Sequence, residues 1–299
     1  VGSTVTAEVA LQVGRALASS GRQRVVVGRD VRESGRMLAR ALTAGVTECG
    51  GDVVDVGVEA TPTIARYVST AGADAGVSVT ASHNPPADNG IKLWSPDGQA
   101  FDESQRREIT RLVEAETFDL AAWDEVGRRV DDADAREAHA DALQEAIAGA
   151  PLSGLSVVVD LGNGTGRVTA DVLDAAGCDV ETLNGQRDGG FPGRPSEPTA
   201  AHCESARRVV DALDADLGIL HDGDADRMLA IDDRGDFVGG DALLALFGRR
   251  ETGAGDRIAA PVNTSMAVAD ALADQGADVA YSRVGDVFVA ERTAESAVV

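Results

Sequence analysis

Short apolar runs rich in valine alternate along this chain with longer segments whose apolar residues recur at helical spacing. In the first 100 residues, runs that predict buried strands lie at 24–28, 52–57 and 75–80. A helix is expected within residues 4–20, and further helices should begin near Ser34 and at Thr61-Pro62. This β-α-β-α-β order with short connections predicts a largely parallel sheet covered by helices.

The same plan is repeated further along the chain. After a hairpin strand from Ile91 and a helix near 102–116, an acidic segment at 131–134 precedes another predicted helix. Later strands are predicted at 156–160, 179–183, 217–221, 228–231, 257–261 and 279–282. The fold class is therefore α/β, with serial β-α-β-α-β units and mixed, largely parallel sheets. We expect domains at 1–130, 131–234 and 235–299, the third of them incomplete.

One helix can be described in more detail from the sequence. Ser34 is placed to cap the second helix. Its apolar face is expected to consist of Met37, Leu38, Ala41, Leu42 and Val46.

Composition narrows the functional classes. The formal net charge is −23 and the sequence pI is about 4.4, with acidic residues spread along the whole chain. Such a field disfavours nucleic acid as a partner. An acidic surface that is poor in lysine suggests a halophilic protein in a cytoplasm of molar salt, where repulsion between carboxylates is screened.

The cysteines and the apolar runs exclude other classes. Cys49, Cys178 and Cys203 are widely spaced without a Cys-x-x-Cys pair, so neither a disulfide framework nor a zinc site is indicated. No apolar run approaches the length that spans a membrane, and no signal peptide opens the chain. We expect a cytoplasmic protein without a membrane partner. Because the chain lacks an initial Met and stops within an apolar run, we expect it to be part of a longer protein.

The segment from Thr80 to Lys92, which begins where the strand at 75–80 ends, combines a serine hydroxyl, an imidazole and a lysine amine. Ser82 and His83 follow the strand. Pro85 and Pro86 then prevent both a helix and further strand pairing. Asn89-Gly90 predicts a turn with positive φ, which would return the chain as a strand and place the Lys92 amine over Ser82. A surface loop with an incidental lysine is the alternative. However, Lys92 is the one lysine among 27 basic residues, which favours a role in proton transfer or phosphate contact.

A second motif, Asp222-Gly223-Asp224-Ala225-Asp226-Arg227, follows the third strand of the second unit. Its three carboxylates alternate on an extended loop and can converge on one hard cation. A solvated acidic turn is the simpler alternative, but the loop lies between two buried strands. An EF-hand is excluded, since Arg227 and Asp233 stand where it requires Gly and Glu. Both motifs therefore lie at carboxyl ends of strands, where open α/β sheets bind ligands.

The segment Thr80-Ala81-Ser82-His83-Asn84-Pro85, with Asn89-Gly90-Ile91-Lys92, resembles the phosphoserine loop of the α-D-phosphohexomutases. The acidic motif is similar to that family's Mg²⁺ loop, although the family more often has Gly at the position of Ala225. The resemblance covers most of a first domain, a second domain and part of a third.

This resemblance implies roles for individual residues. Ser82 would carry a phosphoryl group, and Mg²⁺ would be held by a phosphoserine oxygen with Asp222, Asp224 and Asp226. Lys92 and His83 are the candidate acid and base groups. The planar guanidinium group of Arg227 would add hydrogen-bond donors. Substrate contacts are implied for Asn84, for Arg29 in Gly28-Arg29-Asp30 and for Arg283 in Arg283-Val284-Gly285-Asp286. For Arg29, a helix-capping ion pair explains the sequence nearly as well.

Two functions remain open on the sequence. The first is an isomerase that interconverts hexose 1-phosphate and hexose 6-phosphate as a phosphomannomutase or phosphoglucomutase, with a hexose 1,6-bisphosphate as intermediate and activator. Phosphoglucosamine mutase is an alternative within this class, because the family's sugar-reading Glu-x-Ser-Gly loop and fourth domain are absent from the chain. The second function is a non-catalytic protein that binds sugar phosphates. The intact Ser82, Lys92 and aspartates favour the enzyme, and the oligomeric state is left open.

Overall fold

The computed structural model describes residues 1–2 and 4–294 of the 299-residue chain. The chain divides into two compact units, Val1–Asp236 and Phe237–Val299, each of which is described by itself. The predicted α/β class with mixed sheets is confirmed. No helix within the described residues is both long enough and apolar enough to cross a membrane.

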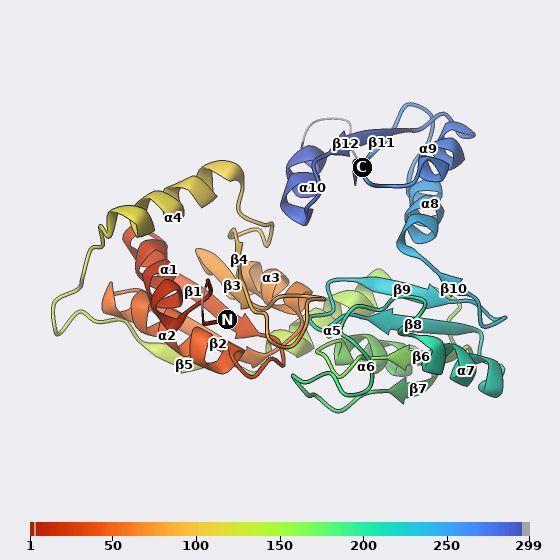
Figure 1. Ribbon diagram of the computed structural model, residues 1–299, viewed down its shortest axis with the longest axis horizontal. Helices are drawn as coiled ribbons and strands as arrows, with labels where there is room; N and C mark the ends of the chain where they lie inside the picture. The colour runs from red at the N-terminus through yellow and green to blue at the C-terminus, as the bar shows by residue number, and fades with distance from the viewer. Residues whose placement is uncertain (3, 295–299) are drawn as a thin grey trace. The chain divides into compact units, whose positions relative to one another are not determined.

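Two five-stranded sheets consist mainly of strands from the first unit, and the first has the order β4-β3-β1-β2-β5 (Figure 1). Its strands are β1 (Arg24–Arg29), β2 (Asp52–Val58), β3 (Ala75–Val79), β4 (Ile91–Trp94) and β5 (Arg129–Asp131). All pairings are parallel except that of β3 with β4. The associated helices are α1 (Ala7–Ser19), α2 (Gly35–Glu48), α3 (Thr61–Thr70), α4 (Glu103–Ala115) and α5 (Ala135–Ala146).

Side-chain alternation along β1 divides the core of this sheet into two layers. Val25 and Val27 pack with apolar residues of α1, α2 and α4 on one face. Val26 packs on the other face with residues of α3 and with Ala135 of α5. Because successive strand residues point to opposite faces, the unbroken valine run predicts a strand that is covered on both sides.

Helices α1 and α2 approach each other through two glycines. A Cβ atom at Gly14 would lie 2.2 Å from the Leu42 carbonyl oxygen, and one at Gly45 would lie 2.1 Å from the Leu11 carbonyl oxygen. These distances leave no room for a side chain, so glycine is required for this helix contact.

The second sheet has the order β10-β9-β8-β6-β7. Its strands are β6 (Ser156–Asp160), β7 (Asp179–Leu183), β8 (Leu217–His221), β9 (Met228–Ile231) and β10 (Phe237–Val238), accompanied by α6 (Arg167–Ala175) and α7 (Glu204–Leu213). Strand β8 pairs in parallel with β6 and antiparallel with β9. The acidic motif from Asp222 to Arg227 directly follows β8, the third strand of this sheet in chain order. In the first sheet, the segment with Ser82 follows β3 in the same way.

The second unit pairs β11 (Arg257–Pro261) in parallel with β12 (Asp278–Ser282). Its helices are α8 (Gly240–Glu251), α9 (Met266–Ala273) and α10 (Asp286–Thr293). Ile258, Val268 and Leu272 are among the buried residues of its small core.

Several local expectations differ from the structure. Met37 is exposed, whereas the other apolar positions predicted for α2 are buried or half-buried. Ser34 is the N-cap residue of α2, but its side chain makes no capping bond and its Oγ accepts a hydrogen bond from Asn89 Nδ2. Strand β5 and helix α10 were not predicted. The domain boundaries stay predictions, and α5, expected in the second domain, packs on α3.

Candidate functional site

The backbone at Ser82 adopts a left-handed conformation with φ of 50°. This region is unfavourable for a residue with a Cβ atom and needs support from its surroundings. Thr80 gives that support, since its Oγ1 accepts a hydrogen bond from the Ser82 N–H at 2.9 Å and donates to Asp30 Oδ2 at 2.7 Å. The turn after β3 is therefore fixed from within the first sheet.

The predicted positive φ at Asn89-Gly90 was wrong, since neither residue has it. Asn89 Oδ1 instead accepts from the Gly90 N–H, and a Cβ atom on Gly90 would lie 2.8 Å from the Thr80 carbonyl oxygen. Glycine is needed at position 90 for this close backbone contact rather than for a left-handed backbone conformation. The hairpin itself is as expected, with Lys92 opposite Ser78 in the antiparallel pair.

Arg32, which sequence reasoning missed, holds the loop that carries Ser82. Its side chain is fully buried, and its Nε donates to Asp30 Oδ2 at 2.9 Å. The guanidinium also donates to the carbonyl oxygens of Ser82, Asn84, Pro85 and Asp88. One planar donor fork therefore satisfies the turn's inward carbonyl groups. The available signal was the spacing Asp30-x-Arg32 directly after a strand.

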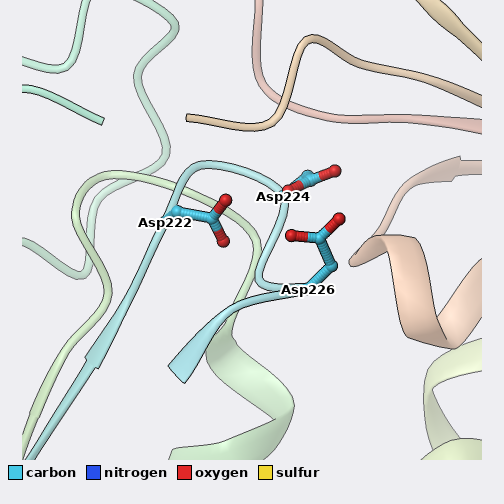
Figure 2. A group of neighbouring side chains, drawn as sticks. All are labelled: Asp222, Asp224 and Asp226. Carbon is cyan, nitrogen blue, oxygen red and sulfur yellow. The ribbon is translucent and has the colours of Figure 1, made fainter. Parts of the chain in front are cut away.

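The loop after β8 brings three carboxylates together (Figure 2). Asp222, Asp224 and Asp226 each offer an oxygen within 4.8 Å of the others, and Asp222 and Asp224 are fully buried. Asp224 Oδ1 is buried without a hydrogen-bond partner among the described residues. A buried carboxylate oxygen without a partner is costly, and an all-oxygen donor set suits a hard divalent cation. The residues present therefore fit a Mg²⁺ ion.

The structure brings Ser82 and Lys92 to these aspartates. Ser82 Oγ donates to Asp222 Oδ2 at 2.8 Å and lies 3.3 Å from Asp226 Oδ1. Lys92 Nζ lies 3.2 Å from Asp224 Oδ2 and 2.5 Å from Asp226 Oδ2. The carboxyl ends of β3 and β8, from two different sheets, thus form one site.

Electrostatics in this cluster are dominated by burial and by carboxylate repulsion. Burial, together with the charges of Asp224 and Asp226, raises the pKa of Asp222 to about 8. Burial alone would lower the pKa of Lys92, but the Asp224 and Asp226 carboxylates outweigh it and raise that pKa above its ordinary value. Lys92 therefore keeps its proton and offsets part of the negative charge.

His83 and Arg227 lie at the margin of this cluster. His83 Nδ1 is 3.5 Å from Ser82 Oγ, and burial followed by the charge of Arg227 lowers the pKa of the imidazole. The side chain of Arg227 is exposed, while its backbone N–H donates to Asp222 Oδ1 at 3.2 Å. His83 also lines a cavity of about 520 Å³ together with Phe191 and Glu197. The imidazole of His83 therefore lies between the Ser82 hydroxyl and this cavity, whereas Arg227 is not among the lining residues.

Of the residues expected to contact substrate, Asn84 and Arg29 do not join this cluster. Asn84 is exposed, its N–H donates to the Ala81 carbonyl oxygen at 3.0 Å, and its carbonyl oxygen accepts from Arg32 Nη2 at 2.7 Å. Arg29 donates to the Asp30 carbonyl oxygen and lines a different cavity, without the helix-capping ion pair considered above. Arg283 belongs to the second unit, where its guanidinium lies over the Phe288 ring at 3.9 Å.

Two further hydroxyl groups form hydrogen bonds with the loop after β8, and no sequence motif identified them. Ser196 Oγ donates to the Ser82 carbonyl oxygen at 3.0 Å and accepts from the Gly223 N–H at 3.1 Å. Thr61, at the start of α3, donates from Oγ1 to Asp224 Oδ2 at 2.7 Å. Only the folded chain brings these positions together, because they are more than 100 residues from one of their partners.

Comparison with protein families matches three consecutive segments of the chain. Residues 1–120, 137–235 and 239–299 match the families described as phosphoglucomutase/phosphomannomutase, alpha/beta/alpha domains I, II and III, respectively.

Similar sequences and solved structures agree with this result. The chain is 46% identical over 288 residues to a probable phosphoglucosamine mutase of Methanococcoides burtonii, covering 96% of this chain and 65% of the relative. It is 44% identical over 297 residues to a protein of the same description from Methanothermobacter thermautotrophicus, covering 98% and 65%. A phosphoglucomutase/phosphomannomutase family protein from Burkholderia thailandensis superposes with a TM-score of 0.82 at 30% identity, covering 100% of this chain and 67% of that structure. The chain thus spans somewhat less than two thirds of the length of these sequence relatives.

Proposed function

The chain belongs to the phosphoglucomutase/phosphomannomutase family, and on that premise we propose that it contains the phosphoryl-transfer centre of a phosphohexomutase. The observation that carries this proposal is the Ser82 hydroxyl, which is hydrogen bonded to Asp222 within the group of three aspartates. A serine hydroxyl is a poor nucleophile unless it is oriented and its surroundings stabilise the developing charge. The contacts of Ser82 supply the orientation.

In the proposed reaction, phosphorylated Ser82 donates its phosphoryl group to a free hydroxyl of a hexose monophosphate. The bond between phosphorus and Ser82 Oγ breaks as the sugar oxygen binds phosphorus, and the proton of that hydroxyl leaves to a nearby base. The bisphosphate then returns its other phosphoryl group to Ser82, so the sugar leaves as the isomeric monophosphate. His83 is the proposed base, since its lowered pKa keeps the imidazole neutral.

Charge compensation is the second requirement of this chemistry, because the transferring phosphoryl group is negative. Lys92 stays protonated beside Asp224 and Asp226 and supplies a fixed positive charge close to Ser82. Asp222, Asp224 and Asp226, with an oxygen of the phosphoryl group, would hold Mg²⁺, which supplies Lewis-acid stabilisation when bound. Asp224 Oδ1 is the unpartnered ligand atom for it.

For the sugar, a glucosamine phosphate is favoured over a glucose or mannose phosphate. The supporting observation is that relatives at 44–46% identity over nearly the whole chain are described as probable phosphoglucosamine mutases. This preference is a finer proposal than the phosphoryl-transfer chemistry and has a separate test.

The chemistry is tested by incubating the chain with glucose 1,6-bisphosphate and Mg²⁺ and mapping the phosphate by peptide mass spectrometry. We expect label on Ser82, no label in Ser82→Ala, and normal label in Ser69→Ala, which changes an exposed serine of α3. Label on another residue, or label that persists in Ser82→Ala, would refute the assignment. Release of the label to glucosamine 6-phosphate should then be faster than release to mannose 6-phosphate or glucose 6-phosphate.

A further inference from the structure

A second charged cavity lies in the first sheet, apart from the centre around Ser82. It has a volume of about 330 Å³ and is bounded by the end of β1, by β2, by β5 and by the first half of α2. Its lining residues are Gly28, Arg29, Arg36, Ala39, Arg40, Asp55, Gly57 and Arg129. None of these residues contributes to the group of aspartates or to the loop from Thr80 to Lys92.

The charge of this cavity is opposite to that of the protein. Four guanidinium groups line it, whereas the chain as a whole carries −23. Asp55 is the one carboxylate in the lining, and Arg129 already binds it through Nε at 3.0 Å and Nη2 at 2.8 Å. The other oxygen of Asp55 accepts the Gly57 N–H at 2.9 Å. Both oxygens of Asp55 therefore have partners, and Asp55 forms no ion pair with Arg29, Arg36 or Arg40.

Three arginines are left with donor capacity directed at the cavity. Arg36 and Arg40, one turn apart on α2, form no ion pair with any described residue. Arg29 is half-buried and uses Nη1 to donate to the Asp30 carbonyl oxygen. Burial lowers the pKa of Arg29 and outweighs the opposing charges of Asp55 and Asp30, and the neighbouring Arg36 charge adds to the lowering.

From this arrangement we propose that the cavity binds a phosphate group, either as inorganic phosphate or as the monoester of a small metabolite. Guanidinium forks match the geometry of phosphate oxygens, and hydrogen bonds between ionised partners are among the strongest in proteins. The cavity volume suits a small molecule, and the overall negative field disfavours a polyanionic macromolecule.

The position of the cavity links it to the loop that carries Ser82. Arg29 is followed directly by Asp30, which binds both Thr80 and Arg32, and Arg32 holds the carbonyl groups of the Ser82 turn. A phosphate bound at Arg29 would thus contact the residue directly before Asp30, the carboxylate that binds Thr80 and Arg32. Because the lining residues are not those of the phosphoryl-transfer centre, the site can exist whether or not the proposed mutase chemistry is correct.

The test uses a pair of matched double variants. Arg36→Gln with Arg40→Gln removes two lining charges, and Arg107→Gln with Arg111→Gln removes two exposed charges from α4. Calorimetric titration with inorganic phosphate, without Mg²⁺, should show a Kd at least about tenfold weaker in the first variant and unchanged in the second. Equal melting temperatures without phosphate would show that both variants fold.

A second experiment identifies where phosphate binds, independently of its affinity. It uses phenylglyoxal, which modifies arginine side chains. Phosphate should protect Arg36 and Arg40 in peptide mass spectra of the unaltered chain, while Arg107 and Arg111 stay reactive. Glycerol 3-phosphate that protects at lower concentration than phosphate would identify a monoester as the ligand, and the reverse order would identify inorganic phosphate. Unchanged affinity in the first double variant, or absence of protection at Arg36 and Arg40, would overturn the proposal.

Discussion

At the scale of single residues, the site depends on side chains whose polar atoms are buried and mutually satisfied. Asp30, Arg32, Asp222 and Asp224 are all almost inaccessible to solvent. Burial of charge is unfavourable unless partners compensate it, so removal of one partner should be costly. Asp224 Oδ1 is the exception that lacks a hydrogen bond, which makes it the most informative position for a metal.

Asp224→Asn removes one ligand charge at nearly constant shape. We expect Mg²⁺ affinity measured by calorimetry to fall at least about tenfold, because loss of a ligand should cost no less than loss of an outer partner. Asp233→Asn, an exposed position outside the group, serves as the control with the same change of charge. Equal affinity in Asp224→Asn and the unaltered chain would place the metal elsewhere.

Arg32→Lys keeps the positive charge beside Asp30 but loses the fork that donates to four carbonyl groups. The free energy of unfolding should fall by about 3 kcal/mol, because buried carbonyl groups lose their donors at about 1–3 kcal/mol each. Amide hydrogen exchange across 82–90 should accelerate more than exchange in α1. Arg234→Lys, at an exposed arginine, should change neither quantity. A loop that stays protected in Arg32→Lys would argue against this supporting role.

At the scale of elements, α5 connects the two sheets of the first unit, since it packs on α3 and also contacts α6. Thr63 of α3 and His139 of α5 meet in a buried hydrogen bond of 2.7 Å between Oγ1 and Nδ1. Thr61, which binds Asp224, lies two residues earlier on α3. The packing of these helices therefore influences how the loops after β3 and β8 meet.

His139 should make this packing sensitive to pH. Burial and, secondarily, the charge of Arg66 lower the pKa of His139 in the folded state. The unfolded chain, with a His pKa of about 6.5, then binds more protons than the folded chain in the window below that value. The stabilisation is complete above about pH 6.5 and is lost as the pH falls toward the lower folded pKa.

The measurement is chemical denaturation at pH 7.5 and 5.5. His139→Gln should show a smaller loss of stability between these pH values than the unaltered chain, and His202→Gln should show the same loss as the unaltered chain. An identical pH dependence in His139→Gln would exclude His139 as the source.

At the scale of the whole molecule, charge is the dominant property. Described ion pairs involve only part of the acidic residues, and many of these pairs are exposed. Exposed pairs contribute little, so they do not compensate a net charge of −23. Halophily therefore stays a prediction that rests on the sequence.

We expect the apparent melting temperature in dilute buffer to be lower by more than about 5 °C than in molar KCl, because salt screens carboxylate repulsion. An equal osmolality of sucrose, which does not screen charge, should restore less of the stability. A melting temperature that is unchanged or higher in dilute buffer would contradict the prediction.

The sequence by itself determined most of the strands and the two motifs that form the site. Valine runs and Gly or Pro punctuation are local signals, so strands β6, β7, β8, β9 and β11 were predicted at their observed residues. Ser82, Lys92 and the three aspartates could be identified because contiguous motifs carry them at carboxyl ends of strands.

Only the tertiary structure decided how these motifs are held together. Arg32, Ser196 and Thr61 act through partners distant in the chain, and a single polar residue has no periodicity that would reveal such contacts. The left-handed turn was expected at Asn89-Gly90 but occurs at Ser82, because bonds to Thr80 and Arg32 outweigh local backbone preference. The arginine-lined cavity likewise arises only when α2 packs over the ends of β1 and β2, which brings together charges that the sequence disperses.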